Sequence, residues 1–435
     1  MLETIIIIFT ALIIIFFPYH YWKKHQNHLN KSRRKHEDNI NAGIGEPVTL
    51  HPRIDPNQCI QTGACLDACP EGDILGIVDG RAQIVSPTRC IGHGACQKAC
   101  PTDAISLIFG TATRGVEIPN VKETFESNVK GVYIAGELGG MGLIRNAITQ
   151  GKEAVEYISK SLNGNRNGRL DLVIIGAGPA GIAASLQAKK EGLNYITVEQ
   201  EDIFGGTILS FPRQKIVMTQ PMQIPMYGKF SKYEIQKEEL LTLLHDVIEQ
   251  NEIKINFAEK VESIEQDDNI YTIVTSKNKY QSRKVLLTIG RRGTPRKLGV
   301  IGEHSSKVTY NLLEPEQYRN RHILVVGGGD SAVEAAAALS EQDGTTVTLS
   351  YRKDAFNRIK EKNREKIEAL AQAGMVDIYF NSQVESIQPD NVIIRIDVKN
   401  IIIPNDYVFV FIGGELPVKL LNGIGISMEM KYGEQ

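Results

Sequence analysis

The sequence predicts an α/β protein with two domains of strand–turn–helix type, preceded by a small α+β domain and one N-terminal transmembrane helix. Three observations support this fold class. Two glycine-rich turns each stand between a buried strand and an alanine-rich helix, six cysteines are gathered in one short stretch, and the chain opens with an uncharged apolar run. At about 150 residues per domain, the 435 residues suggest three domains.

The composition is that of a folded globular protein, with 42% hydrophobic and 23% charged residues. These values exclude a disordered, collagen-like or multi-span membrane protein. Lys and Arg total 49 and Asp and Glu total 51, so the net charge is −2. Because there is no basic excess, we expect no nucleic-acid partner.

The N-terminus predicts a membrane anchor. From Thr4 to Trp22 the chain has 19 residues without a charge, just enough for one helix across ~30 Å of hydrocarbon. We assign residues 1–22 to the anchor and residues 23–50 to a basic linker. Basic residues follow only on the C-terminal side, so the positive-inside rule predicts a single-pass membrane protein with the rest of the chain in the cytoplasm. A short interfacial segment interrupted by Pro18 is the alternative, since the basic start and small-residue cleavage site of a signal peptide are absent.

The six cysteines form two copies of one motif. Each copy reads C-x5-C-x3-C-P, and the second begins 31 residues after the first. The cysteines are Cys59, Cys65, Cys69, Cys90, Cys96 and Cys100. In a long chain with nucleotide-type turns, clustered thiolates favour metal binding over disulfides. A zinc site would normally carry paired C-x2-C, which is absent.

The motif resembles the two-cluster bacterial ferredoxins, whose run is C-x2-C-x2-C-x3-C-P. The resemblance implies a ferredoxin-like domain over residues 51–108 with two iron–sulfur clusters. In that fold the last cysteine of each run ligates the other cluster. The implied groups are therefore Cys59, Cys65 and Cys100 for one cluster, and Cys69, Cys90 and Cys96 for the other. A degenerate ferredoxin remnant is the alternative.

The motif departs from the family at the second cysteine of each run. That position is Thr62 in the first copy and His93 in the second, so each group offers three thiolates. Three thiolates suffice for a [3Fe–4S] cluster. A [4Fe–4S] cluster needs a fourth ligand from Thr62, His93, water or a partner.

The first glycine turn predicts a dinucleotide site. Leu170–Ile175 reads as a buried strand, and Gly176, Gly178 and Gly181 follow in the pattern G-x-G-x-x-G. A second strand, Tyr195–Val198, ends at Glu199. The glycines let the backbone approach a pyrophosphate, and Glu199 can accept from a ribose 2′-OH, which favours the unphosphorylated adenosine of FAD.

The second glycine turn has the same form but a different end. His322–Val326 is a strand, Gly327, Gly329 and Ala332 follow, and Thr345–Leu349 is the next strand. No acid stands where Glu199 stands in the first unit. The basic residues there are Arg352, Lys353 and Arg358. They suit a 2′-phosphate and hence NADPH over NADH, while a solvated basic loop is the alternative.

Two such units resemble the thioredoxin-reductase-like flavoproteins, in which the nucleotide domain is inserted into the FAD domain. We expect an FAD-binding domain at residues 109–291 and 412–435, and an NAD(P)H-binding domain at residues 292–411. The family's last flavin-contacting element matches residues 131–147 instead of the stretch before Gln435. That segment includes Gly136 and Glu137, the latter in place of the family's Asp. The sequence therefore predicts a circularly permuted flavoprotein.

The resemblance implies an FAD-dependent NAD(P)H oxidoreductase. The nucleotide domain lacks the family's C-x2-C, and residues 351–360 resemble the cysteine-poor bacillithiol-disulfide-reductase-like branch. We expect a membrane-anchored enzyme that passes electrons between NADPH, FAD and the clusters to or from a ferredoxin, cytochrome or quinone. No side-chain acid or base is required. A homodimer is typical of related flavoproteins. A disulfide reductase with auxiliary clusters and a non-enzymatic membrane-tethered redox sensor are the alternatives.

Overall fold

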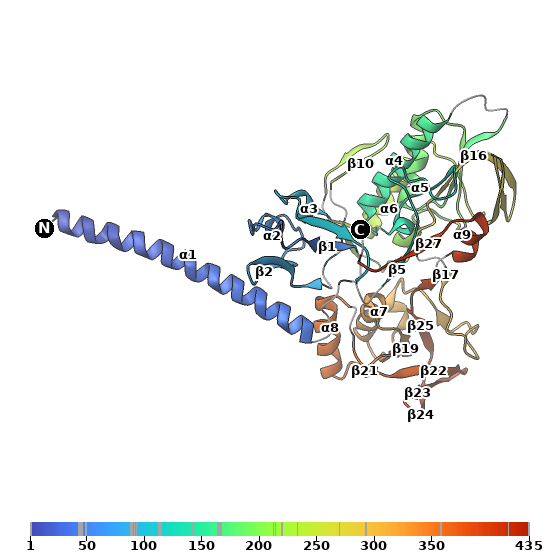
Figure 1. Ribbon diagram of the computed structural model, residues 1–435. Coiled ribbons are helices and arrows are strands. Elements are labelled where there is room, and N and C mark those ends of the chain that lie inside the picture. Colours follow the sequence, from blue (N-terminus) through green and yellow to red (C-terminus); the bar gives the residue numbers. More distant parts are fainter. Residues whose placement is uncertain are drawn as a thin grey trace. The chain divides into compact units, whose positions relative to one another are not determined.

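The computed structural model describes residues 2–41, 47, 50–87, 90, 92, 94–111, 115–140, 142–162, 168–211, 213, 215–218, 221–232, 234–268, 270–291, 294–356, 359–415 and 417–433 (Figure 1). The chain forms two compact units. The first comprises Met1–Gly115 with Tyr432–Gln435, and the second comprises Val116–Lys431. The cysteine motifs lie in the first unit, and both glycine turns lie in the second.

The first unit contains two small antiparallel sheets. Strand β1 (His51–Ile54) pairs with β4 (Ile105–Ile108), and β2 (Leu75–Val78) pairs with β3 (Arg81–Ile84). Two one-turn helices, α2 (Ala64–Asp67) and α3 (Ala95–Lys98), repeat at the spacing of the motif. Each begins after a glycine with positive φ, 75° at Gly63 and 74° at Gly94, which is a conformation that glycine adopts without strain.

Helix α1 (Leu2–Asn41) packs its C-terminal part onto the β2–β3 hairpin. Ser32 is buried there. His36 Nδ1 lies 3.1 Å from the Ile84 carbonyl oxygen, and Asn39 Nδ2 donates to the Val85 carbonyl oxygen at 2.9 Å. These side chains recur at the spacing of one helix face. Much of the expected linker over residues 23–50 is therefore a docked helix.

The predicted transmembrane anchor over residues 1–22 is not supported. Helix α1 does not end at Pro18 or Trp22 but continues through the basic stretch to Asn41. Within the residues that the structure describes, no helix is long and apolar enough to span a membrane. The predicted single-pass membrane location, and the orientation that rested on it, are therefore wrong.

The second unit has a seven-stranded sheet that carries the first glycine turn. Its strands are β6 (Val132–Ile134), β7 (Leu170–Ile175), β8 (Tyr195–Val198), β13 (Ile255–Asn256), β14 (Val261–Asp267), β15 (Ile270–Thr275) and β16 (Lys279–Leu287). The order is β13-β8-β7-β16-β15-β14, and β6 also pairs with β16. Strands β6, β7, β8, β13 and the end of β16 run parallel. The apolar side chains of β6, of β7 from Leu172 on and of the end of β16 are buried on both faces. The predicted strands Leu170–Ile175 and Tyr195–Val198 are confirmed.

Three helices accompany this sheet. They are α4 (Ile144–Ser161), α5 (Pro179–Lys190) and α6 (Lys237–Gln250). Pro179 occupies the first turn of α5, where its missing N–H costs nothing. Smaller pairs of strands join β9 (Ile216–Met218) to β12 (Glu234–Gln236) and β10 (Met222–Ile224) to β11 (Gly228–Phe230). A one-turn 3₁₀ helix, η3 (Gly206–Ile208), follows β8.

A five-stranded parallel sheet carries the second glycine turn. Its order is β18 (Val308–Thr309), β25 (Tyr407–Val410), β19 (His322–Val326), β20 (Thr346–Ser350) and β21 (Val376–Tyr379). Helices α7 (Asp330–Ser340) and α8 (Glu361–Gln372) pack with it, and the 3₁₀ helix η4 (Pro315–Tyr318) precedes β19. An antiparallel meander of β22 (Ser382–Ile387), β23 (Asn391–Ile396) and β24 (Lys399–Pro404) follows. The predicted strand His322–Val326 is confirmed, and the predicted Thr345–Leu349 is shifted by one residue.

Two strand pairs mark where segments distant in sequence meet. Strand β17 (Thr294–Pro295) pairs with β26 (Gly414–Glu415), so the two connections to the five-stranded sheet lie together. Strand β5 (Val116–Pro119) pairs antiparallel with β27 (Met428–Lys431), which follows helix α9 (Val418–Ile424) (Figure 1). The first and last strands of the second unit therefore pair with each other.

Candidate redox site

The first glycine turn (residues 176–181) brings β7 and α5 into close contact. Gly176 has a φ of 105°, and a Cβ there would lie 2.7 Å from the Thr288 carbonyl oxygen. A Cβ on Gly181 would lie 1.9 Å from the Gly176 carbonyl oxygen, so a side chain at that position requires a backbone shift. The first N–H groups of α5 have no partner within the helix, which suits them to a pyrophosphate.

Glu199 lies at the end of β8 and faces this turn. It is buried, and its Oε2 accepts the N–H of Ala177 at 2.6 Å. Its Oε1 accepts the N–H of Glu201 at 3.1 Å. The carboxylate is therefore fixed beside the glycine turn, where an acid in this fold receives the ribose hydroxyls of a dinucleotide.

The main chain around Glu199 is supported by a second buried acid, Glu259. The N–H of Glu259 donates to the Glu199 carbonyl oxygen at 2.8 Å, and the N–H of Glu199 donates to the Asn256 carbonyl oxygen at 2.8 Å. Burial raises the pKa of Glu259. Hydrogen bonds donated by Thr275 at 2.6 Å and Tyr280 at 2.9 Å outweigh that effect and hold the pKa below its usual value.

The upstream segment of residues 131–147 reaches the start of α5. Gly136 follows β6 with a φ of 87°, and its N–H donates to Gln150 Oε1 at 2.8 Å. A Cβ on Gly136 would lie 3.0 Å from the Cβ of Ala180 in α5. Glu137 opens the next turn, η2 (Glu137–Gly139). The structure therefore brings Gly136 to the first glycine turn although 40 residues or more separate them in sequence.

The second glycine turn (residues 327–332) repeats the first in form. Gly327 has a φ of 143°, and a Cβ there would lie 2.3 Å from the Phe411 carbonyl oxygen. Gly329 caps α7, and Ala332 is buried in its first turn. Nothing lies within 4 Å of a Cβ on Gly329, and the position that matches Gly181 of the first turn is occupied by Ala332.

Basic residues follow β20, at the place where the acid Glu199 follows β8 beside the first glycine turn. Arg352 is exposed and Lys353 is half-buried. Among the described residues, neither side chain has an ion-pair partner. Arg358, the third basic residue predicted at this site, lies outside the described residues. The two described cations are therefore free to meet an anionic group at the end of the strand.

The six cysteines form two groups of three around two cavities. Cys59, Cys65 and Cys100 line one cavity, with a volume of about 330 Å³ that includes open solvent. The other cavity has the same volume, and its cysteines are Cys69, Cys90 and Cys96. Each group combines two cysteines of one motif with the last cysteine of the other motif, as the ferredoxin resemblance implies. Their role as cluster ligands stays a prediction.

The thiols differ in their surroundings. Burial raises the pKa of Cys65 and Cys90, and it raises the pKa of Cys96 to about 11, with the nearby Cys90 adding to the effect. At Cys100 burial also raises the pKa, but hydrogen bonds from Thr102 and the N–H of Ala104 outweigh it and the pKa is lowered. The Ala104 N–H lies 3.3 Å from Cys100 Sγ. Because the pKa values of the more buried thiols are raised, metal binding there must release their protons and is favoured by higher pH.

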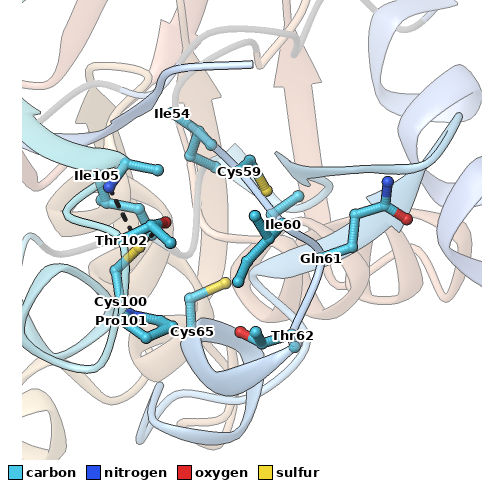
Figure 2. A pocket seen from close by; sticks show the side chains of 13 residues that line it. Ile54, Cys59, Ile60, Gln61, Thr62, Cys65, Cys100, Pro101, Thr102 and Ile105 are labelled. Atoms are coloured by element: carbon cyan, nitrogen blue, oxygen red, sulfur yellow. Dashed lines mark hydrogen bonds between the residues drawn. The ribbon is translucent and has the colours of Figure 1, made fainter. Parts of the chain in front are cut away.

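The cavities suit a cluster better than a single ion. Within the described ranges, no three Cys, His, Asp or Glu side chains converge closely enough to hold one metal ion. Figure 2 shows Cys59, Cys65 and Cys100 around the first cavity, with Thr62 beside Cys65. Three separated thiols with apolar walls fit an iron–sulfur cluster, which has several metal atoms to bind.

Comparison with known proteins identifies the larger unit. Residues 173–433 match the family of pyridine nucleotide-disulphide oxidoreductases. The chain belongs to this family. Residues 51–101 match a 4Fe-4S dicluster domain. The protein is thus a pyridine nucleotide-disulphide oxidoreductase with an iron–sulfur domain, and it is an FAD-dependent enzyme of the ferredoxin- and thioredoxin-reductase type.

Two relatives illustrate the similarity of this oxidoreductase to curated proteins. The ferredoxin–NADP reductase of Ignicoccus hospitalis is 27% identical over 270 residues, which cover 60% of this chain and 83% of the relative. The bacilliredoxin reductase of Bacillus subtilis is 27% identical over 267 residues, covering 60% and 82%. Among solved structures, the bacillithiol disulfide reductase of Staphylococcus aureus is 26% identical with a TM-score of 0.54, covering 60% of this chain and 81% of that one.

Two residues near the nucleotide turns were not singled out from the sequence. Thr288 Oγ1 lies 2.9 Å from the carbonyl oxygens of both Ile175 and Gly176 and braces the first turn. Asp330 Oδ1 accepts from the N–H of Lys360 at 2.8 Å and from Asn363 Nδ2 at 2.7 Å, which ties the second turn to α8. The sequence offers one signal for Asp330, because acidic residues are favoured in the first turn of a helix.

Proposed function

We propose that this oxidoreductase passes electrons between NADPH and a one-electron partner of the ferredoxin, cytochrome or quinone type. FAD would supply the exchange between two-electron and one-electron chemistry, and two iron–sulfur clusters would carry single electrons. One observation supports this function above the others. The six cysteines gather into two three-thiol cavities, whereas residues 116–431 contain no cysteine at all.

The lack of cysteine in the second unit excludes an internal dithiol as the electron acceptor. A thiol pair next to the flavin is what an internal disulfide route would require, and the sequence has none outside residues 59–100. The clusters proposed for the two cavities are then the remaining groups of this protein that could accept electrons from the flavin. In this proposal the six cysteines are ligands and no side-chain acid or base takes part in the reaction.

NADPH is assigned to the second glycine turn. Gly327, Gly329 and the start of α7 would receive the pyrophosphate. Arg352 and Lys353 would bind the 2′-phosphate, with Arg358 as a third cation. Their lack of ion-pair partners among the described residues favours this assignment, since no acid there has to be displaced.

FAD is assigned to the first glycine turn, completed by the upstream segment. Glu199 would accept the ribose hydroxyls, and Gly136 and Glu137 would approach the ribityl side. We also propose that the flavin-binding fold is circularly permuted. The parallel pairing of β6 with β16 and the β5–β27 pair support this, because they place the upstream segment where the C-terminal element would otherwise continue.

The test is an anaerobic NADPH titration of the full chain followed by visible and EPR spectroscopy, with iron, sulfide and flavin measured on the same sample. The full chain is used because α1 packs on the β2–β3 hairpin of the domain that holds the cysteines. We expect the flavin band to bleach and cluster signals to change with it. Flavin reduction in a sample whose iron is absent or unresponsive would contradict the proposal.

A second candidate is an NADPH-dependent disulfide reductase with auxiliary clusters. The similarity to the bacilliredoxin reductase and the bacillithiol disulfide reductase favours it. The two candidates are separated by the rate of NADPH oxidation with a low-molecular-weight disulfide against the rate with a one-electron acceptor such as ferricyanide. Electron transfer predicts the faster rate with ferricyanide, and a faster rate with the disulfide would favour the second candidate.

A further inference from the structure

The two cysteine cavities differ where the fourth thiolate is missing. In the first cavity this position is Thr62, on a loop that faces solvent. Ile60 is 63% exposed, and Gln61 and Thr62 are exposed as well. A Cβ on Gly63, the next residue, would meet nothing within 4 Å. The missing corner of the first cavity is therefore open.

The equivalent stretch of the second cavity is covered. Gly92 and Gly94 are buried, and a Cβ on Gly92 would lie 2.7 Å from the Leu50 carbonyl oxygen. Leu50 is itself buried, at 6% exposure. A Cβ on Gly94 would lie 3.2 Å from a methyl group of Leu107. His93 is outside the described residues. The main chain on both sides of it is packed, in contrast to the loop around Thr62.

The Thr62 hydroxyl is already used by the local turn. Its Oγ1 lies 3.4 Å from the N–H of Ala64, at the start of α2. A neutral hydroxyl is also a weak ligand for iron in comparison with a thiolate. Thr62 thus marks the open corner without filling it.

The lining of the first cavity offers an incoming molecule apolar contacts and no charged side chain. Apart from its cysteines, the lining is made of apolar and neutral side chains and carries no charged group. The apolar members include Ile54, Ala82 and Ile105. A carboxylate would therefore find no cation there, whereas a thiol finds apolar contacts and the soft metal that thiolates prefer.

We propose that the first cavity holds its cluster through three cysteine thiolates and that the open corner at Thr62 takes a small thiolate from solution. The inference rests on the proposed function, which assigns clusters to the cavities. With Cys59, Cys65 and Cys100 holding the cluster, a thiol from solution would release its S–H proton to solvent, and its sulfur would donate an electron pair to the iron that lacks a cysteine ligand. No atom is oxidised or reduced.

Two cysteine substitutions on the exposed loop test this. Thr62→Cys supplies the fourth thiolate from the chain itself. Gln61→Cys is the matched control, because the Gln61 side chain points away from the three cysteines (Figure 2). Full-length wild type and variants are loaded with iron and sulfide anaerobically, and iron content and EPR spectra are recorded with and without 2-mercaptoethanol.

We expect 2-mercaptoethanol to change the EPR spectrum of the wild type and of Gln61→Cys. Thr62→Cys should not respond, and after mild oxidation it should keep one more iron atom per chain than the wild type. Thr62→Val, which has no hydroxyl, should respond to the thiol as the wild type does.

Three results would overturn the inference. They are a wild-type spectrum that ignores the thiol, a Thr62→Cys protein indistinguishable from Gln61→Cys, and a loss of iron in Thr62→Val, which would make the hydroxyl a ligand. The proposed function survives each of these as long as the wild type binds iron. A wild type that binds no iron overturns both.

Discussion

The two glycine turns of the second unit share one construction and differ at one position. In both, a glycine with positive φ follows a buried parallel strand, and a Cβ there would collide with a carbonyl oxygen of a neighbouring segment. After the next strand, the first turn meets the buried and hydrogen-bonded Glu199, whereas β20 is followed by Tyr351 and then by the exposed Arg352. The two turns thus share a scaffold and differ in the charge of the residues that follow the next strand, which is where the proposed choice between FAD and NADPH would be made.

The largest expected effect comes from adding a methyl group to the first turn. Gly181→Ala places a Cβ 1.9 Å from the Gly176 carbonyl oxygen, so the turn must shift. Overpacking of this kind costs about 1–3 kcal/mol, which corresponds to FAD binding weaker by roughly 5- to 150-fold. Flavin content after gel filtration and the FAD dissociation constant measure it.

Gly329→Ala in the second turn is the control for flavin binding. Nothing lies within 4 Å of a Cβ there, and the φ of Gly329 is −103°, which other residues adopt. We expect normal flavin content in this variant, because Gly329 lies in the turn that is assigned to NADPH and not to FAD. An equal loss of flavin in both variants would contradict the assignment of FAD to the first turn.

The next effect in size concerns the acid of the first turn. Glu199→Ala removes a buried carboxylate that accepts two N–H groups and leaves those donors unpaired. Such a loss costs about 1–3 kcal/mol, so FAD should bind roughly 10-fold or more weakly. Fluorescence titration of the flavin-free protein with FAD measures this change. Unchanged affinity would argue against a role for Glu199 in ribose binding.

A smaller effect is expected at the basic end of the second turn. The double substitution of Arg352 and Lys353 by alanine should raise the KM for NADPH by about 10-fold and leave the KM for NADH nearly unchanged, because only NADPH carries the 2′-phosphate. Lys399→Ala, at an exposed lysine on β24, is the control. A parallel rise for both nucleotides would contradict recognition of the 2′-phosphate.

The smallest effect concerns the acid behind Glu199. The folded-state pKa of Glu259 lies below its usual value, so this group contributes stability at pH values above its unfolded pKa. That contribution is lost as the pH falls through the lower, folded pKa. Thermal unfolding should therefore show a drop in melting temperature below about pH 4.5 that is weaker in Glu259→Gln. Identical dependence of the melting temperature on pH in the wild type and in Glu259→Gln would contradict a stabilising role for the Glu259 carboxylate.

The sequence predicts the nucleotide-binding strands well because their signal is local. Leu170–Ile175 and His322–Val326 are mostly apolar runs followed by glycine, and the structure has them at the same bounds. The predicted end of β20 at Leu349 is one residue short, because Ser350 is polar yet buried within the strand. The grouping of the cysteines followed from a resemblance, because spacing alone does not tell which thiols from two motifs meet.

The N-terminal segment is where the sequence misleads. Pro18 and the aromatic residues near it suggest the end of a membrane span, yet α1 continues past them. Its contacts with the β2–β3 hairpin include those of Ser32, His36 and Asn39. Polar residues give no apolar periodicity from which a docked helix face could be read. The open corner at Thr62 was equally hidden, because exposure of a loop depends on what packs over it.

The most direct test of the central claim is a count of the electrons that NADPH delivers to each chain. The full-length protein, loaded with flavin and clusters, is titrated anaerobically with NADPH while flavin absorbance and EPR signals are followed. If the clusters accept electrons beyond those held by the flavin, reduction requires more than one equivalent of NADPH per FAD. An end point at one equivalent, with cluster signals unchanged, would contradict electron flow between NADPH and the clusters.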